Sequence, residues 1–171
     1  MITLIMSRTA EIPEPYLDAW RAFLNAHAAT IDRIEQALAA RGLPPLSWYD
    51  ALWPLYRAPG RKLRMGELAA QVVTISRSGL TRLVDRLAAA DLVQREPTPD
   101  DRRGTVVAIT REGSALIRKM WPVYAQEIRR SFVDVLGDEE AAMLGETLER
   151  VHAAATLAPG SLSERAPSAR T

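Results

Sequence analysis

Residues 65–87 read MGELAAQVVTISRSGLTRLVDRL and contain two helical patterns in succession. The first, from Met65 to Val72, is short, and Ser76 is a good N-cap for a longer helix that ends near Ala90. Apolar residues of the longer helix recur at spacings of three and four, which places one face together: Leu80, Leu83, Val84 and Leu87. A short helix, a brief turn and a longer helix with a polar opposite face predict a helix-turn-helix.

The residues after this pair predict a β-hairpin. Residues 92–96 alternate in part between apolar and polar side chains, and residues 105–109 are rich in β-branched side chains. Residues 97–104, between the two segments, carry the Pro, Asp and Gly residues that favour turns. We therefore expect a hairpin whose tip, with two adjacent arginines, Arg102 and Arg103, is suited to entering a groove of DNA.

Two helical patterns precede the helix-turn-helix. The first lies between Pro15 and Arg41, and its members recur at helical spacing: Leu17, Trp20, Leu24, His27, Ile31, Ile34 and Leu38. A helix of this length with one apolar seam needs a partner, which is either its own domain or a second subunit. A second helix should begin at Ser47, because Ser47 and Asp50 resemble a capping box. Pro54 should kink or shorten this helix.

The C-terminal part of the chain predicts two further helices. The first is capped by Thr110 and continues to about Leu136, with a bend at Pro122. The second runs to about Leu157, and we expect its apolar residues to face inward: Met143, Leu144, Leu148 and Val151. The residues from Ala158 onward are rich in Pro, Ser, Ala and Gly and predict a disordered tail.

Positive charge is concentrated in one segment of a nearly neutral chain. The formal net charge is +1 at pH 7, but residues 57–86 contain seven Lys and Arg residues against two acids, Glu67 and Asp85. This segment therefore carries +5, and the rest of the chain carries −4. A local basic excess suits a nucleic-acid interface, because cations that contact phosphates release counterions. A solvated basic surface is the alternative.

The composition disfavours several classes of function. The chain has no cysteine, which excludes disulfides, thiol redox sensing and cysteine zinc sites. Its two histidines, His27 and His152, form no ligand motif, so we expect neither a metal nor a cofactor. No nucleophile elbow or phosphate loop indicates an enzyme. No apolar run reaches the roughly 20 residues of a membrane span. The first residues are too short and too weakly charged for a secretory signal, and Met6 is an alternative start.

Several short motifs together resemble one family. They are GELA at 66–69, SRSGLTRLVDRL at 76–87, LVQR at 92–95, DRRG at 101–104 and VAIT at 107–110, followed by Gly113. In combination they resemble the MarR family of bacterial winged-helix repressors and activators. Two positions depart from the pattern. Asp91 stands where such sequences usually have glycine, and it tolerates a left-handed backbone at modest cost. Gly79 either lets DNA approach the backbone closely or is neutral.

The resemblance implies a mainly helical α+β fold, a winged helix-turn-helix with dimerisation helices at both ends. Its parts are an N-terminal segment (1–14), a dimerisation helix (15–46), the DNA-binding domain (47–110), C-terminal dimerisation helices (111–157) and the tail (158–171). The implied protein is a cytoplasmic, nucleoid-associated homodimer that binds a palindromic operator in double-stranded DNA, with repression as the expected outcome. Residues 17–38 and 143–157 would form the dimer interface, although ordinary core packing explains each position equally well.

The resemblance also places the DNA contacts. The longer helix would enter the major groove through Ser76, Arg77, Ser78, Thr81, Arg82 and Arg86. Its arginines suit guanine edges or phosphates, and its hydroxyls suit phosphates. Alternatively, Arg82 or Arg86 pairs with Asp85 inside the fold. The hairpin would place Arg103, with Arg102 beside it, in the minor groove. Asp101 would orient the hairpin through a salt bridge, unless it only favours the turn.

A small aromatic effector is a further expectation from the resemblance, because members of the family often respond to aromatic anions. Six residues are candidates to line a pocket: Trp20, His27, Trp48, Tyr49, Trp53 and Tyr56. Aromatic residues at helical spacing equally predict a packed core. The alternative function is a winged-helix adaptor between proteins that does not bind DNA, but such a module should lack groove-facing arginines.

Overall fold

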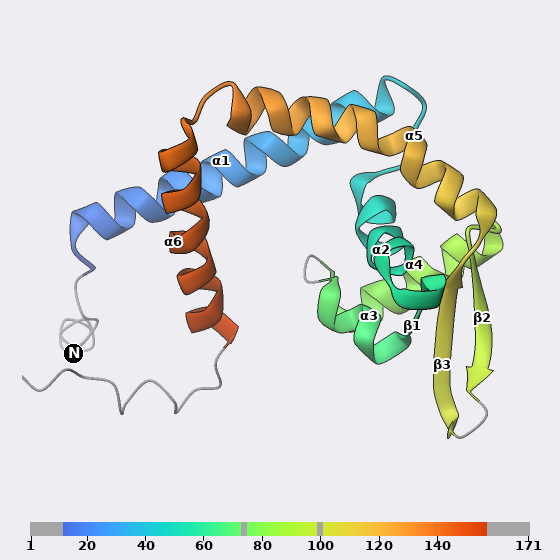
Figure 1. Cartoon of the computed structure of the whole chain (residues 1–171). Coiled ribbons are helices and arrows are strands. Elements are labelled where there is room, and N and C mark those ends of the chain that lie inside the picture. The colour runs from blue at the N-terminus through green and yellow to red at the C-terminus, as the bar shows by residue number, and fades with distance from the viewer. Residues whose placement is uncertain (1–11, 73–74, 99–100, 157–171) are drawn as a thin grey trace, which may run out of the picture. The chain divides into compact units, whose positions relative to one another are not determined.

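The computed structural model describes residues 12–72, 75–98 and 101–156, which form two compact units. The first unit extends to Ile128, and the second begins at Arg129. Helices dominate the described residues, and one small antiparallel sheet accompanies them (Figure 1). This architecture confirms the predicted mainly helical fold with a β-hairpin wing.

The predicted helix pair and hairpin both lie in the first unit. In chain order, that unit contains α1 (Glu14–Ala39), α2 (Leu46–Arg57), the 3-10 turn η2 (Pro59–Arg61), β1 (Lys62–Arg64), α3 (Met65–Gln71), α4 (Arg77–Ala89), β2 (Val93–Thr98), β3 (Asp101–Ile109) and α5 (Arg111–Ile128). The second unit contains the π-helical turn η3 (Arg129–Val133) and α6 (Asp138–Thr156). The helix-turn-helix is thus α3 and α4, and the hairpin is β2 and β3.

The sheet has three strands in the order β1-β3-β2, all antiparallel. Val107 in the central strand pairs with Leu63 on one side and with Arg95 on the other. The strands extend into residues 97–104, which we predicted to be a turn, so that prediction was wrong. The ladder can include Pro97 because β2 is an edge strand and the register shifts after this residue.

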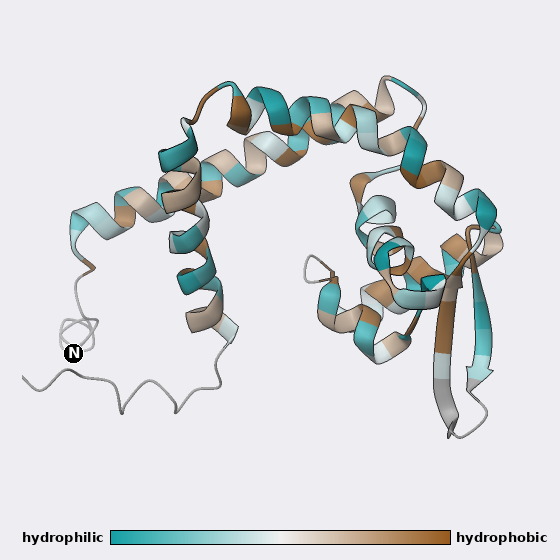
Figure 2. Ribbon diagram, in the orientation of Figure 1, coloured by the Kyte–Doolittle hydropathy of each residue, from teal (hydrophilic) through white to brown (hydrophobic). Residues whose placement is uncertain are grey.

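The apolar face of α4 is the centre of the core. Leu80, Leu83, Val84 and Leu87 are all buried, which confirms the predicted helical stripe. They pack in one cluster with buried residues of α2, α5 and the sheet, among them Leu52, Met120 and Val107. Apolar residues recur along each of these helices (Figure 2). Burial of this face fixes the opposite, polar face of α4 toward solvent.

The start of α2 differs from the prediction. The helix begins at Leu46, Pro45 occupies the N-cap position, and neither Ser47 nor Asp50 forms a capping box. The carboxylate of Glu35, on α1, instead accepts a hydrogen bond from the Leu46 N–H at 3.1 Å. A side chain from another helix thus satisfies an end group that the local sequence does not.

Part of the apolar seam of α1 lacks a partner within the described chain. Ile34 and Leu38, near its C-terminal end, are buried, whereas Trp20 near the other end is 54% exposed. In α6, we expected Met143 and Val151 to face inward, but they are 68% and 51% exposed. Nothing else in the described chain covers these side chains.

The helix predicted from Thr110 to Leu136 is not continuous. Thr110 caps it as expected, since its Oγ1 accepts a hydrogen bond from the Gly113 N–H at 3.0 Å. However, α5 ends at Ile128, and the π-helical turn η3 follows. A π turn holds an extra residue, which shifts the apolar spacing by only one position. Periodicity over this stretch therefore does not distinguish it from a continuous α-helix.

Candidate nucleic-acid interface

The N-terminus of α4 is capped by the residue that the sequence predicted. The Ser76 hydroxyl accepts a hydrogen bond from the Gly79 N–H at 3.2 Å, and its oxygen lies 3.3 Å from that of Ser78. Both serines are exposed. Because the cap uses a lone pair of Ser76, its hydroxyl proton remains available to a phosphate oxygen.

The exposed face of α4 carries the other predicted contacts. Ser78, Thr81, Arg82 and Arg86 are all exposed on the side away from the core. Arg77 begins the helix, but its side chain lies outside the described part of the structure. Within the described residues, neither Arg82 nor Arg86 forms an ion pair. The two guanidinium groups are therefore available to a polyanion.

Arg82 and Arg86 also border a shallow depression of about 640 Å³ beside α4. Ser47, Ile75, Gly79 and Leu83 complete its lining. A Cβ at Gly79 would lie 2.8 Å from Cγ2 of Ile75 and 3.1 Å from the Ser76 hydroxyl. Close packing at the helix N-terminus thus gives Gly79 a structural role, in addition to the two explanations that the sequence suggested.

The one acidic residue on this face is neutralised from the sheet. Asp85 accepts a hydrogen bond from a guanidinium nitrogen of Arg95, on β2, at 2.6 Å. The alternative in which Asp85 pairs with Arg82 or Arg86 is therefore wrong. The pair joins α4 to the wing, which we define as the β2–β3 hairpin, and it reduces the repulsion between the Asp85 carboxylate and a phosphate backbone.

The base of the wing is tightly packed against the start of α5. Asp91 has a φ of 57°, as predicted for the residue after a helix, and the next N–H, of Leu92, donates to the Leu87 carbonyl at 2.9 Å. Thr110 donates its N–H to the Leu92 carbonyl at 3.0 Å and its hydroxyl to the Asp91 carbonyl at 2.7 Å. We call Asp91, Leu92, Thr110 and Gly113 the wing base.

Gly113 is the tightest point of the wing base. A Cβ on this residue would lie 2.2 Å from the Leu92 carbonyl oxygen and 2.8 Å from a side-chain carbon of Ile109. Only glycine fits there without a shift of the backbone. The hairpin and α5 therefore meet at a spacing that depends on one residue.

The basic segment 57–86 does not form one uniform patch. Lys62 forms an ion pair with Glu96 at 2.9 Å, and its neighbour Arg61 lies over the ring of Tyr56, 4.6 Å from the ring centre. Arg57 lies over Trp53 in the same way, at 5.6 Å. The cations that remain for a nucleic acid are thus concentrated on α4.

The hairpin tip is described only in its backbone. Asp101, Arg102 and Arg103 are the first residues of β3, and their side chains lie outside the described part. The structure therefore does not test the predicted salt bridge of Asp101 or the predicted position of Arg103.

The structure divides the six predicted pocket residues. Tyr49, Trp53 and Tyr56, on α2, stack with Trp121 and Tyr124 of α5, and we call these five residues the aromatic cluster. Trp48 packs against the core beside them. Trp20 and His27 are not in this cluster but flank Phe23 on α1, with ring centres 5.9 and 6.3 Å from its own. The spacing of Trp121 and Tyr124 placed them on the apolar side of α5, but not beside α2.

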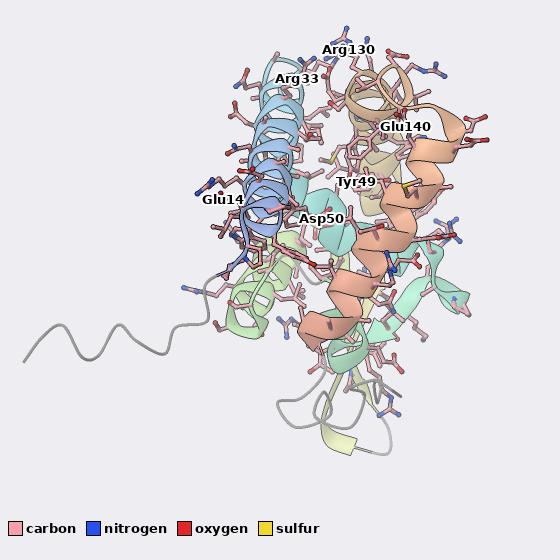
Figure 3. The ribbon with its side chains drawn as sticks, turned by 90° about the vertical axis from the view of Figure 1, so that its left-hand side faces the viewer. Glu14, Arg33, Tyr49, Asp50, Arg130 and Glu140 are labelled. Atoms are coloured by element: carbon pink, nitrogen blue, oxygen red, sulfur yellow. The ribbon has the colours of Figure 1, made fainter. Side chains whose placement is uncertain are left out.

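One buried polar atom stands out in the aromatic cluster. Tyr49 is 3% exposed, and its hydroxyl is the single buried side-chain polar atom without a hydrogen-bond partner among the described residues. It lies on α2 next to Asp50 (Figure 3). Burial, reinforced by Tyr124 and Asp50, raises the pKa of Tyr49 to about 12, and burial also raises the pKa of Tyr124.

Replacing Tyr49 with phenylalanine should stabilise the fold. We expect the free energy of unfolding to rise by about 1 kcal/mol, because the substitution removes a buried, unpaired hydroxyl. In the native chain the raised pKa values leave stability unchanged below pH 10 and lower it between pH 10 and 12, since only the unfolded state ionises there. Tyr49→Phe should weaken this alkaline loss in urea denaturation. Tyr16→Phe, at an exposed tyrosine, should change neither quantity. A less stable Tyr49→Phe chain would show that the hydroxyl has a partner.

An ion pair that the sequence did not suggest connects α1 and α5. A guanidinium nitrogen of Arg33 donates to the carboxylate of Glu127 at 3.2 Å, and Glu127 is 4% exposed. Arg33 is labelled on α1 in Figure 3. The two residues are 94 positions apart, so no local pattern could have paired them.

Other kinds of site are not found in the described residues. No group of three or more His, Cys, Asp or Glu side chains there could hold a metal ion. None of the helices described has both the length and the apolar composition of a membrane span.

Known proteins resemble this chain in sequence and in fold. The MarR family model matches residues 41–104. Sco3205, a MarR family transcriptional regulator from Streptomyces coelicolor solved in complex with DNA, is 30% identical; the match covers 91% of this chain and 95% of that one, with a TM-score of 0.81. AbsC, from the same organism, is 29% identical, with coverage of 86% and 98% and a TM-score of 0.78.

A curated relative agrees with these structures. The HTH-type transcriptional regulator MhqR of Bacillus subtilis is 29% identical over 127 residues, which are 74% of this chain and 84% of its own. The matched regions contain the helix-turn-helix, the wing and the helices around them, and the matched proteins are regulators, not enzymes. The chain therefore belongs to the MarR family of winged helix-turn-helix transcriptional regulators.

Proposed function

We propose that this regulator is a homodimer that binds a palindromic operator in double-stranded DNA and represses transcription. The observation that carries the proposal is the exposed face of α4, where Arg82 and Arg86 have no acidic partner among the described residues. This face stands beside a wing whose base is fixed to α5. Sco3205, which has the same fold, was solved in complex with DNA.

The helix α4 enters the major groove in this proposal. Its N-terminal turn presents the Ser76 and Ser78 hydroxyls, and the positive end of the helix dipole, to phosphate oxygens. Arg77 and Arg82 contact guanine edges, Thr81 contacts a phosphate, and Arg86 contacts the backbone beside the groove. Asp85 does not oppose this binding, because Arg95 already neutralises its charge.

The wing contacts the flanking minor groove. Arg103, with Arg102 beside it, enters that groove, and Asp101 orients the hairpin. The backbone supports this arrangement, since β3 runs without a break from the wing base to the residues that carry these arginines. Two structural elements of each subunit thus hold one stretch of duplex.

A second copy of the chain covers the exposed apolar residues of α1 and α6. Exposed aromatic and aliphatic side chains on one helix face are unfavourable in water, and a partner that buries them stabilises both chains. A two-fold dimer presents two copies of α4 to successive turns of the major groove, so the operator repeats with inverted symmetry about one helical turn apart.

Repression follows from occupancy alone. A dimer bound across a promoter excludes other proteins from the same stretch of duplex. A small aromatic effector relieves this repression by binding near the aromatic cluster, where the Tyr49 hydroxyl offers an unused hydrogen bond. Trp20, His27 and Trp48 complete the effector site in this proposal, and they do so only after dimerisation brings a second α1 close.

Selection of bound duplexes from a random pool tests the proposal. We expect the selected sequences to share an inverted repeat, and we expect aromatic acids added to the binding reaction to release the DNA. A promoter that contains the selected site should drive less reporter expression when the protein is present. Recovery of sequences without any common motif would contradict operator recognition.

Arg103→Ala tests the wing. We expect this variant to bind most sequences more weakly, including sequences without the operator, because a minor-groove arginine acts mainly through charge. Two arginines are lost per dimer, so the slope of log affinity against log salt should fall by about 2 in magnitude. Fluorescence anisotropy over a range of salt concentrations measures both effects. An unchanged affinity would exclude a role for the wing.

A further inference from the structure

Arg61 has an unusual backbone conformation. Its φ is 57°, and it follows Gly60, whose φ is 66°. Among the described residues, Asp91 is the only other non-glycine residue with a positive φ, and it has a capping role. Left-handed backbone is unfavourable for a residue with a Cβ, so contacts of Arg61 must hold it in place.

The Arg61 side chain joins two parts of the first unit. Its Nη1 donates a hydrogen bond to the Ser114 hydroxyl, on α5, at 3.0 Å. Its guanidinium lies over Tyr56 of the aromatic cluster, 4.6 Å from the ring centre. Ser114 is 5% exposed, so the hydrogen bond is shielded from water at one end.

Ser114 continues this connection to the wing base. Its hydroxyl donates to the Thr110 carbonyl at 2.9 Å, and Thr110 in turn binds the Leu92 and Asp91 carbonyls. The residue after Arg61 reaches the wing from the other side. Lys62 begins β1, pairs with Ala108 of β3 and forms an ion pair with Glu96 of β2.

We propose that Arg61 is a positioning residue for the wing. It fixes the wing base relative to the end of α2, so that the hairpin and α4 reach DNA together. The inference rests on the proposed function, because it assigns Arg61 a role in DNA binding. An exposed arginine can also contact a phosphate directly, and the test must separate these two roles.

Arg61→Gly and Ser114→Ala are the informative variants. Glycine keeps the left-handed backbone and removes only the side chain. Ser114 is buried and cannot reach DNA, so Ser114→Ala affects binding only through position. We expect each variant to weaken binding to a selected operator about tenfold, with the salt dependence unchanged. The double variant should bind no more weakly than Arg61→Gly, because both changes break one connection. Arg61→Lys, which keeps a donor and a charge, should restore part of the affinity.

Arg57→Ala is the matched control. Arg57 also lies over a ring of the aromatic cluster, Trp53, and its removal should leave the affinity within about twofold of the native value. Thermal denaturation of every variant shows whether the titrations were made on folded protein. Native affinity in Ser114→Ala, together with a weaker Arg61→Gly whose salt slope is reduced, would overturn the proposal in favour of a phosphate contact. Native affinity in both variants would also overturn it.

The native chain in the same titration separates the two levels of the account. If the native protein binds no duplex, the proposed function fails and this inference fails with it. If the native protein binds and the variants match it, only the positioning role fails.

Discussion

Gly113→Ala is expected to lower the free energy of unfolding by about 3 kcal/mol, and the melting temperature by roughly 10 °C. The added Cβ would lie 2.2 Å from the Leu92 carbonyl oxygen, which is a backbone atom and cannot rotate away. Either β2 or the first turn of α5 must shift. Because Thr110 and Asp91 are hydrogen-bonded at the same place, the shift also strains their bonds.

The same shift should impair DNA binding. The wing leaves the first unit at this point, so displacement of its base moves the hairpin tip relative to α4. Gly66→Ala is the matched control, since a Cβ at Gly66, in α3, meets nothing within 4 Å. Alanine there should be neutral or stabilising by up to about 1 kcal/mol, because it is the better helix former. Equal stabilities of the two variants would show that the wing base is not packed as described.

Arg82→Ala should weaken binding to the selected operator about a hundredfold. Arg82 is exposed on the polar face of α4 and has no ion pair with a described residue, so its removal leaves the fold intact. A bidentate contact with a base supplies about 1–3 kcal/mol, and a dimer loses two such contacts. If Arg82 contacts a base, discrimination should relax at one position in each half-site.

Arg118→Ala controls for the loss of charge. Arg118 is exposed on α5, outside α4 and the wing, and its substitution changes the net charge equally. Anisotropy titrations of both variants, against the operator and against an unrelated duplex, separate the two effects. An Arg82→Ala chain that binds the operator as tightly as Arg118→Ala does would exclude Arg82 from the interface.

Local patterns predicted the parts of the fold that local physics determines. The four apolar residues of α4 are buried because a helix with one apolar face has one stable orientation on a core. Ser76 caps α4, Thr110 caps α5 and Asp91 takes the left-handed conformation, each for reasons contained within a few residues. The same short-range logic identified the exposed face of α4 as the candidate interface.

Long-range contacts explain what the sequence did not predict. The strand β1 has three residues and exists because Leu63 meets Val107 in β3, so no periodicity shows it. Asp85 is paired by Arg95, from a different element, although Arg82 and Arg86 are nearer in sequence. Glu35 caps α2 from another helix. Each of these contacts depends on the packing of elements, which composition and spacing do not specify.

The most direct test is the mass of the complex with a selected duplex, measured by sedimentation at increasing salt. The account predicts two chains on one duplex, bound tightly at low ionic strength and released steeply as salt rises. A protein that sediments as a single chain and leaves every duplex free at low salt would contradict the account.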